Sequence, residues 1–309
     1  MKRVFIDGSA GTTGLRIHER LTGRADIELV TLDEALRKDP AAKRAMLNGG
    51  CDIAFLCLPD DAAREAVGMI EDPDVVVLDT STAHRTDPRF VYGFPELSAE
   101  RREAIRTAKR IAVPGCHASG FIALVYPPVE AGLIAPDTRL TCHSLTGYSG
   151  GGKKMIAQYE ADRPDPLLAG PRQYGITQEH KHLKEMVHVT GLAAKPVFCP
   201  IVASFYSGME VTVPLFAEDL HGTADDIRAV YAKKYTGPIV RYAENADESG
   251  FYSAAALSGT DGMEITVAGN DERLLLVARY DNLGKGASGA AVECLNLVLG
   301  TEETTGLEL

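Results

Sequence analysis

A glycine-rich turn follows the first apolar run of the chain and opens a helix-like segment. Val4 to Ile6 reads as a buried strand, and the glycines of residues 8–14 have GxxGxxG spacing, with Ala10 where the commoner fingerprint has its second glycine. Glycines let a backbone approach a phosphate closely, and free N–H groups at a helix start bind anions. The turn predicts a dinucleotide site rather than a mere tight connection, and its expected contacts are Gly8, Ser9, Gly11, Thr12, Thr13 and Gly14.

The first hundred or so residues alternate short apolar runs with helix-like segments. Strand-like runs lie at residues 4–6, 28–32, 53–58, 75–78 and 110–113. Helical patterns fall between them at residues 13–21, 39–48 and 60–70, and Asp60 is the expected N-cap of the last one. This rhythm is typical of βαβ units and predicts a Rossmann-type, doubly wound parallel sheet, an α/β fold.

The second half changes to strands joined largely without intervening helices. Strand-like runs lie at residues 139–145, 198–205, 209–216, 263–267 and 274–280, and residues 269–272 suit a hairpin turn. Thr223 and Asp226 form a capping box before a helix at 224–235. We expect a nucleotide-binding domain over 1–115, with the helical segment of 285–309 packing back on it. Residues 116–284 are expected to form an α+β domain with a mixed, largely antiparallel sheet.

Charge and cysteine content exclude several classes of protein. The chain has 32 Lys and Arg against 43 Asp and Glu, a net charge of −11 at pH 7 that would repel nucleic acid and anionic lipid. Its six cysteines show no CxxC pair and no zinc spacing, which argues against a metal site and a disulfide framework. No apolar run approaches the ~20 residues of a membrane span, and the first residues do not resemble a signal peptide. We therefore expect a cytoplasmic protein that binds neither nucleic acid nor membrane.

One cysteine stands in an unusual local setting. Cys116 follows Pro114 and Gly115, between a strand and an apolar helix that runs from about residue 118 to 129. A helix N-terminus favours thiolate over thiol, and the turn would point the sulfur out at the end of the sheet, where α/β proteins bind ligands. Cys116 is therefore the candidate nucleophile, whereas the other five cysteines read as small core residues.

The residues after the second strand give conflicting signals about the cofactor. Asp33 lies about 20 residues past the glycine turn, where an acidic residue normally accepts the ribose 2′-OH and favours NAD. Arg37 and Lys38 follow at once and could meet a 2′-phosphate, although charges in such a loop are more often simply solvated. The local sequence leaves NAD and NADP open.

Seven separated motifs, in order, resemble those of N-acetyl-γ-glutamyl-phosphate reductase and, more distantly, aspartate-semialdehyde dehydrogenase. They are the turn at 8–14, DTSTAHR at 79–85, GFPE at 93–96, PGC at 114–116, SGGG at 149–152, HKHLKE at 180–185 and DNLGKGA at 281–287. The resemblance spans nearly the whole chain. The wording GCHAS at 115–119 is similar to the short form of the enzyme.

The resemblance implies a reaction and roles for particular residues. Members reduce N-acetyl-γ-glutamyl phosphate with NADPH, through a cysteine thioester, to N-acetylglutamate semialdehyde and phosphate in arginine biosynthesis, and they need no metal. By resemblance, Cys116 is the nucleophile and His180 the acid/base. His182, Glu185 and Arg85 are implied to bind substrate, with Glu185 able to orient a histidine. Ser149, Gly150 and Asn282 join Arg37 as implied contacts of NADP(H).

Several readings stay open at this level. Another acyl-phosphate reductase of the same architecture, such as aspartate-semialdehyde dehydrogenase, would share the chemistry. A regulator that binds the nucleotide without turnover would keep the fold, although an intact Cys116 and His180 argue against it. Proton transfer could fall to His180 or His182. The family implies a homodimer or homotetramer, and the subunit number is not readable from the sequence.

Overall fold

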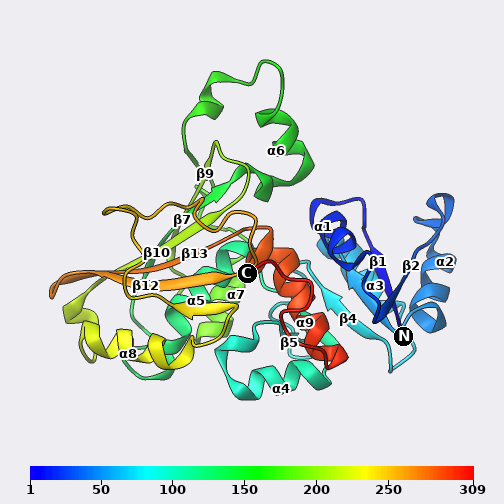
Figure 1. The fold of residues 1–309 in the computed structure, drawn as a ribbon, viewed down its shortest axis with the longest axis horizontal. Helices are drawn as coiled ribbons and strands as arrows, with labels where there is room; N and C mark the ends of the chain where they lie inside the picture. The colour runs from blue at the N-terminus through cyan, green and yellow to red at the C-terminus, as the bar shows by residue number, and fades with distance from the viewer. The chain divides into compact units, whose positions relative to one another are not determined.

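The computed structural model describes residues 1–309, and the chain forms two compact units (Figure 1). Unit 1 comprises Met1–Pro114 and Ala287–Leu307, and unit 2 comprises Gly115–Gly286 and Glu308–Leu309. From the sequence we set the boundaries at 115/116 and 284/285 and kept the whole C-terminal segment with the first domain. Its last two residues instead belong to unit 2, because the Asp261 N–H donates to the Glu308 carbonyl at 2.6 Å.

Unit 1 contains a six-stranded sheet in which all neighbours are parallel. The strand order is β2-β1-β3-β4-β6-β5. The strands are β1 (Lys2–Asp7), β2 (Ile27–Val30), β3 (Ile53–Leu56), β4 (Val76–Asp79), β5 (Val91–Tyr92) and β6 (Arg110–Ala112). Alternate residues of these strands face opposite sides of the sheet, and apolar residues predominate on both.

Helices cover both faces of this sheet. One core combines Val4 and Phe55 with Ile17 of α1 and Val292 of α9, and the other combines Phe5 with residues around α3. The helices are α1 (Thr12–Leu21), α2 (Pro40–Ala45), α3 (Asp60–Gly68), α4 (Ala99–Thr107) and α9 (Gly289–Leu299), with short helical turns at Glu34–Leu36, Met46–Gly50 and Pro95–Leu97. The Rossmann-type expectation is confirmed.

Unit 2 contains a seven-stranded mixed sheet in the order β11-β12-β13-β10-β7-β9-β8. Its strands are β7 (Thr141–Gly147), β8 (Arg172–Gln173), β9 (Val197–Ala203), β10 (Met209–Phe216), β11 (Val240–Tyr242), β12 (Met263–Gly269) and β13 (Arg273–Tyr280). The pairs β7–β9 and β11–β12 are parallel, and the other four are antiparallel. A mixed, largely antiparallel sheet is thus confirmed.

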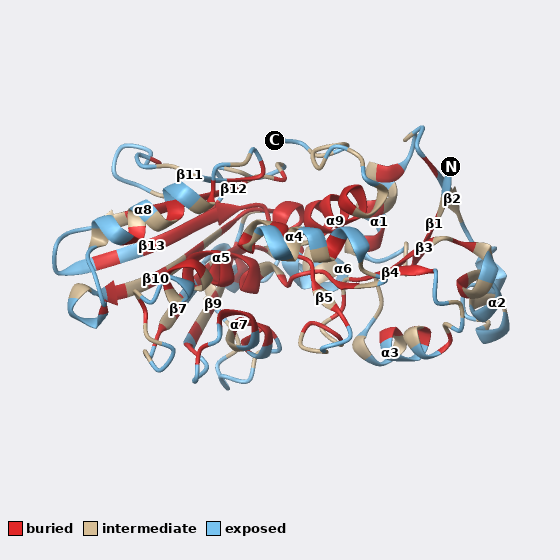
Figure 2. Cartoon of the chain, turned by 90° about the horizontal axis from the view of Figure 1, so that it is seen from below, coloured by how far each residue is buried: buried red, intermediate tan, exposed pale blue.

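The faces of this second sheet differ in exposure. The helices of unit 2 are α5 (Cys116–Glu130), α6 (Gly152–Tyr159), α7 (Leu183–Thr190) and α8 (Ala224–Lys234), with short turns at Tyr148–Gly151, Pro166–Ala169, Ala217–Asp219 and Gly284–Ser288. Helix α5 is buried along most of its length (Figure 2). Exposed apolar side chains remain on the strands at Val197, Phe216 and Leu275.

Two local expectations need correction. The second half has helices between its strands, because α6 and α7 lie between β7 and β9, and α7 buries Leu183, Met186 and Val189. Asp60 is the first residue of α3 and not its N-cap, which is Pro59. The Asp60 carboxylate instead accepts the Thr82 N–H at 2.9 Å, which ties α3 to the segment after β4.

The capping box before α8 is confirmed. The Thr223 hydroxyl accepts the Asp226 N–H, and the Asp226 carboxylate accepts the Thr223 N–H.

None of the helices is both long enough and apolar enough to span a bilayer.

Candidate active site

Cys116 is the first residue of α5. Gly115 precedes it in extended conformation, and no side chain caps this helix start. Cys116 is half-buried, whereas Cys51, Cys142 and Cys294 are buried. Burial raises the pKa of Cys51 to about 12, which keeps that thiol protonated. The uncapped N–H groups of α5 favour an anion beside them, so Cys116 is placed to react as a thiolate.

Two histidines and two other aromatic side chains pack around His117, the residue that follows Cys116. The ring of His117 lies 5.8 Å from that of His180 and 5.7 Å from that of His182, and the latter two are 4.7 Å apart. Tyr174 and Phe198 complete the group, with ring centroids 5.9 and 5.4 Å from His117. Four residues that lie 57 or more positions after His117 in the chain therefore join it to form one wall beside the cysteine.

The proton on the His180 ring is placed by a backbone contact. The His182 N–H donates to Nδ1 of His180 at 3.2 Å. A backbone N–H can only donate, so Nδ1 must be the unprotonated nitrogen and a neutral His180 carries its proton on Nε2. Burial, aided by the Lys181 cation, lowers the pKa of His180 to about 4. At neutral pH this side chain is therefore an uncharged Nε2–H donor.

His117 is a buried, neutral part of the same wall. Its Nδ1 lies 2.6 Å from Oγ of Ser144, and its Nε2 lies 2.5 Å from Oη of Tyr174. Burial, aided by His180, lowers the pKa of His117 to about 3. The sequence analysis assigned no role to His117 or Tyr174. His117 could have been singled out from its place beside Cys116, but nothing local marks Tyr174.

Glu185 connects the histidine segment to the start of α5. Its Oε2 accepts the Gly115 N–H at 3.1 Å, and its Oε1 lies 4.0 Å from Nε2 of His182. The carboxylate is 2% exposed. Glu185, in the first turn of α7, therefore holds the residue before the cysteine, and it lies close to His182, the N-cap of the same helix.

Two other predicted site residues, Arg85 and Asn282, hydrogen-bond to backbone or side-chain groups of their own unit. Arg85, in unit 1, donates from Nε to the Val113 carbonyl and from Nη2 to the Thr80 carbonyl, both at 2.9 Å. Asn282, in unit 2, donates to Oγ of Ser149 at 2.9 Å and accepts the Gly208 N–H at 2.9 Å. Their predicted contacts with substrate or cofactor stay predictions.

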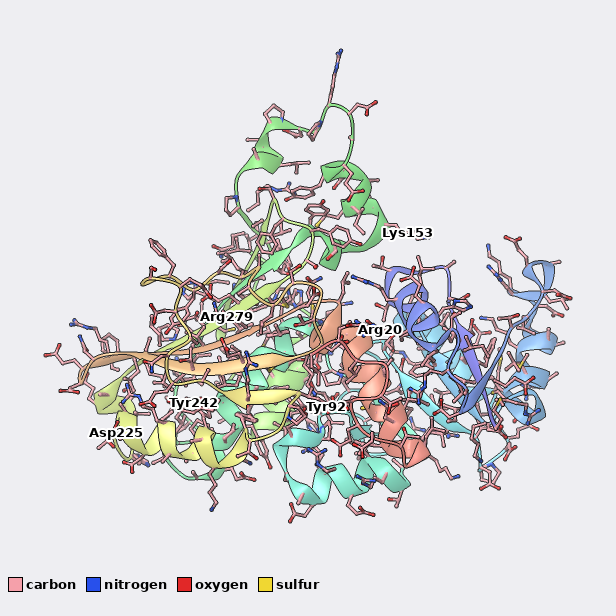
Figure 3. The ribbon with its side chains drawn as sticks, in the orientation of Figure 1. Arg20, Tyr92, Lys153, Asp225, Tyr242 and Arg279 are labelled. Atoms are coloured by element: carbon pink, nitrogen blue, oxygen red, sulfur yellow. The ribbon has the colours of Figure 1, made fainter.

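The second glycine-rich turn leads into α6. Ser149 is buried and held by Asn282, whereas Gly150 is exposed. Lys153, which is labelled in Figure 3, lies in the first turn of α6, and both Lys153 and Lys154 are exposed. The turn thus offers backbone groups and two cations to a ligand.

The glycine turn of unit 1 has the close packing expected of a phosphate cradle. A Cβ on Gly8 would lie 2.2 Å from the Cys57 carbonyl oxygen, and one on Gly14 would lie 2.4 Å from the Gly8 carbonyl oxygen. Gly11 is the N-cap of α1, and no side chain caps that helix. These residues fit a pyrophosphate on the free N–H groups of α1.

The loop after β2 keeps its charged residues in solvent. Asp33 precedes the short helical turn at Glu34–Leu36, and Asp33, Arg37 and Lys38 are all exposed. The carboxylate and both cations are therefore free to approach a ribose. This geometry does not choose between NAD and NADP.

Comparisons with known proteins agree with the two-domain fold. The family described as "Semialdehyde dehydrogenase, dimerisation domain" matches residues 116–282, and "Semialdehyde dehydrogenase, NAD binding domain" matches residues 28–107. Two solved aspartate semialdehyde dehydrogenases share the fold. The Vibrio cholerae enzyme II has a TM-score of 0.74 at 16% identity over 97% of this chain and 98% of its own. The Francisella tularensis enzyme has a TM-score of 0.72 at 14% identity over 96% and 100%.

Closer relatives in sequence carry one name. "N-acetyl-gamma-glutamyl-phosphate reductase 2" of Nostoc sp. is 44% identical over 99% of both chains, and the protein of the same name in Pseudomonas putida is 43% identical over 98% of both. "N-acetyl-gamma-glutamyl-phosphate reductase" of Burkholderia cenocepacia is 45% identical over 96% of this chain and 97% of its own. With this identity over nearly the full length of both proteins, the chain belongs to the N-acetyl-γ-glutamyl-phosphate reductase family.

Proposed function

We propose that this protein reduces N-acetyl-γ-glutamyl phosphate with NADPH to N-acetylglutamate semialdehyde and phosphate, a step of arginine biosynthesis. The observation that carries the proposal is that Cys116, at an uncapped helix start, is followed by His117, whose ring packs against His180, a neutral Nε2–H donor. Nearly full-length relatives at about 44% identity bear the name of this activity.

Cys116 would form the covalent intermediate. Its thiolate attacks the acyl carbon, a tetrahedral oxyanion forms, and the C–O bond to phosphate breaks to leave a thioester. The first N–H groups of α5 stabilise the thiolate before attack and after its release. Glu185 supports this step by holding Gly115, the N-cap of the same helix.

His180 would stabilise the oxyanion that forms in each half of the reaction. A neutral Nε2–H can donate to the carbonyl oxygen as negative charge develops, in acylation and again when hydride reaches the thioester. In the reverse direction the same Nε2–H would stabilise the oxyanion that forms when the Cys116 thiolate adds to the aldehyde. The Nδ1 contact with the His182 N–H supports His180 over His182 as the residue with this role.

The nicotinamide cofactor, when bound, supplies the hydride. The GxxGxxG turn would hold its pyrophosphate through Gly8, Ser9, Gly11, Thr12, Thr13 and Gly14. We propose NADPH, with Arg37 on the 2′-phosphate and Asp33 turned away. Ser149, Gly150 and Asn282 are proposed as further cofactor contacts, Asn282 acting through the turn that it braces.

Substrate recognition is proposed for Arg85, His182 and Glu185. The substrate carries a carboxylate and a phosphate, which a guanidinium binds well. Nε and Nη2 of Arg85 each bind a backbone carbonyl, which fixes the orientation of its guanidinium. Glu185 and His182 are buried beside Cys116, which supports an indirect contribution through the site's geometry.

The chain carries its family's dimerisation domain, and we propose that it forms a homodimer or homotetramer. Val197, Phe216 and Leu275 are exposed on strands of the second sheet, which supports burial of that face between subunits. All six cysteines are free thiols, which supports a reducing, cytoplasmic location. Sedimentation velocity would give the subunit number.

A substrate panel tests the proposed function. Phosphate-dependent oxidation should be measured with N-acetylglutamate semialdehyde and with aspartate semialdehyde, each with NADP and NAD. We expect kcat/KM to be highest for N-acetylglutamate semialdehyde with NADP, and Cys116→Ser to abolish it. Faster oxidation of aspartate semialdehyde would assign the chain to the rival reaction, and nucleotide binding without turnover of either would indicate a regulator.

A further inference from the structure

The last residue of β13 contacts the backbone at the start of α5. Oη of Tyr280 donates to the Cys116 carbonyl at 2.5 Å and accepts the Gly120 N–H at 3.0 Å. These two backbone groups are the i and i+4 partners of the first helical turn. The hydroxyl therefore bridges the turn that begins with the cysteine.

This contact depends on a glycine in α5. A Cβ on Gly120 would lie 2.7 Å from Oη of Tyr280 and 2.6 Å from the Val211 side chain. No larger residue at 120 leaves room for the ring in its present position. Tyr280 is fully buried, so its hydroxyl cannot exchange the helix backbone for water.

The same segment touches Cys116 a second time. A Cβ on Gly286 would lie 3.1 Å from Cβ of Cys116 and 3.4 Å from its Cα. The Gly286 N–H donates to the Asp281 carbonyl at 3.0 Å, which closes the loop back on β13. Tyr280 and Gly286 thus meet the cysteine at its carbonyl and at its side-chain base.

The loop between the two contacts is held firmly. Oδ1 of Asp281 accepts the Leu283 N–H at 2.6 Å. Oδ2 accepts the Ser207 hydroxyl at 2.7 Å and the Gly259 N–H at 2.5 Å. A positioning residue needs such a supporting shell to keep its own geometry.

We propose that Tyr280 is a positioning residue for Cys116, which fixes the first turn of α5 so that its N–H groups face the thiolate. A helix start favours thiolate only in the first turn, so a shift of that turn would make the thiol harder to ionise and misplace the sulfur. The proposal rests on the proposed role of Cys116 as nucleophile.

The test compares Tyr280→Phe with Tyr235→Phe. Oη of Tyr235 donates to the Ala123 carbonyl at 2.7 Å. The control therefore also removes a buried hydroxyl that binds the backbone of α5, but at a point away from the start of that helix. We expect Tyr280→Phe to lower kcat roughly 10- to 100-fold, the cost of a small misplacement of reacting groups, with KM nearly unchanged. The rate of Cys116 alkylation should rise with pH at a higher midpoint than in wild type. Tyr235→Phe should match wild type in both.

Gly286→Ala provides a second arm if Tyr280→Phe does not fold. It should slow turnover and Cys116 alkylation, whereas Gly262→Ala, where a Cβ meets only an ordinary contact at 3.7 Å, should not. An unchanged alkylation profile in Tyr280→Phe, or equal losses in both Tyr→Phe variants, would overturn the proposal. Alkylation needs no substrate, so it reports on positioning even if the proposed reaction fails.

Discussion

Replacing His180 by Gln or by Asn tests whether this side chain acts as a hydrogen-bond donor or as a base. The His182 N–H fixes Nδ1 of His180 as an acceptor, which leaves Nε2–H as the ring's donor. The amide nitrogen of Gln reaches about as far as Nε2, whereas that of Asn reaches only about as far as Nδ1. His180→Gln therefore keeps a donor near the oxyanion, and His180→Asn does not.

The expected magnitudes follow from the hydrogen bond that is kept or lost. Losing a positioned acid/base lowers kcat by roughly 10²–10⁴, which is our expectation for His180→Asn, with a smaller change in KM. A hydrogen bond to a charged group contributes about 1.5–3 kcal/mol, or roughly 10- to 150-fold. We therefore expect His180→Gln to retain at least about tenfold more kcat than His180→Asn.

The kcat of both variants is measured from the steady-state oxidation of NADPH with N-acetyl-γ-glutamyl phosphate as substrate. His188→Gln on the exposed side of α7 is the matched control and should keep wild-type kcat. Because burial lowers the pKa of His180 to about 4, the residue stays neutral down to about that pH and should give kcat no pH dependence near 6.5. Equal kcat for the Gln and Asn variants, or a wild-type limb near pH 6.5 that His180→Gln abolishes, would refute the donor role.

Three further expectations concern the thiol, the cofactor and stability. Iodoacetamide should modify Cys116 before the other five cysteines, with protection by the acyl phosphate, and a peptide map without preference would contradict the reactive-thiol assignment. Arg37→Ala with Lys38→Ala should raise KM for NADPH roughly tenfold or more and spare NADH; equal loss of both cofactors would make Asp33 the ribose ligand. The pKa of His117 falls to about 3 in the fold, so the unfolded chain takes up the proton first as pH drops below about 6.5. Unfolding in urea should thus show about 1 to 2 kcal/mol less stability at pH 5 than at pH 6.5 from this residue, and His117→Asn should remove that difference.

The features predictable from the sequence are those whose cause is local. The turn at Gly8 to Gly14 was readable because strand, glycines and helix follow one another, and the structure places a helix start there. The capping box of Thr223 and Asp226 needs only three residues of separation. Cys116 was singled out by the turn before it, and the structure places it first in α5.

The features that could not be predicted depend on distant partners. Tyr174 meets His117 only because β8 and β9 are antiparallel neighbours, with β9 parallel to β7. Asp60 looked like an N-cap, but its carboxylate was taken by the Thr82 N–H, 22 residues away. Helix α7 was not predicted, because it follows a polar segment and its apolar residues pack on elements that are distant in the sequence.

Mass spectrometry of the acylated enzyme tests the central claim most directly. The protein would be mixed with freshly prepared N-acetyl-γ-glutamyl phosphate in the absence of NADPH, quenched in acid and digested. We predict one N-acetylglutamyl group on Cys116, released when NADPH is added before the quench, and none in Cys116→Ser. Rapid reduction of the substrate by an enzyme that carries no acyl group, or an acyl group on another residue, would contradict the proposed mechanism.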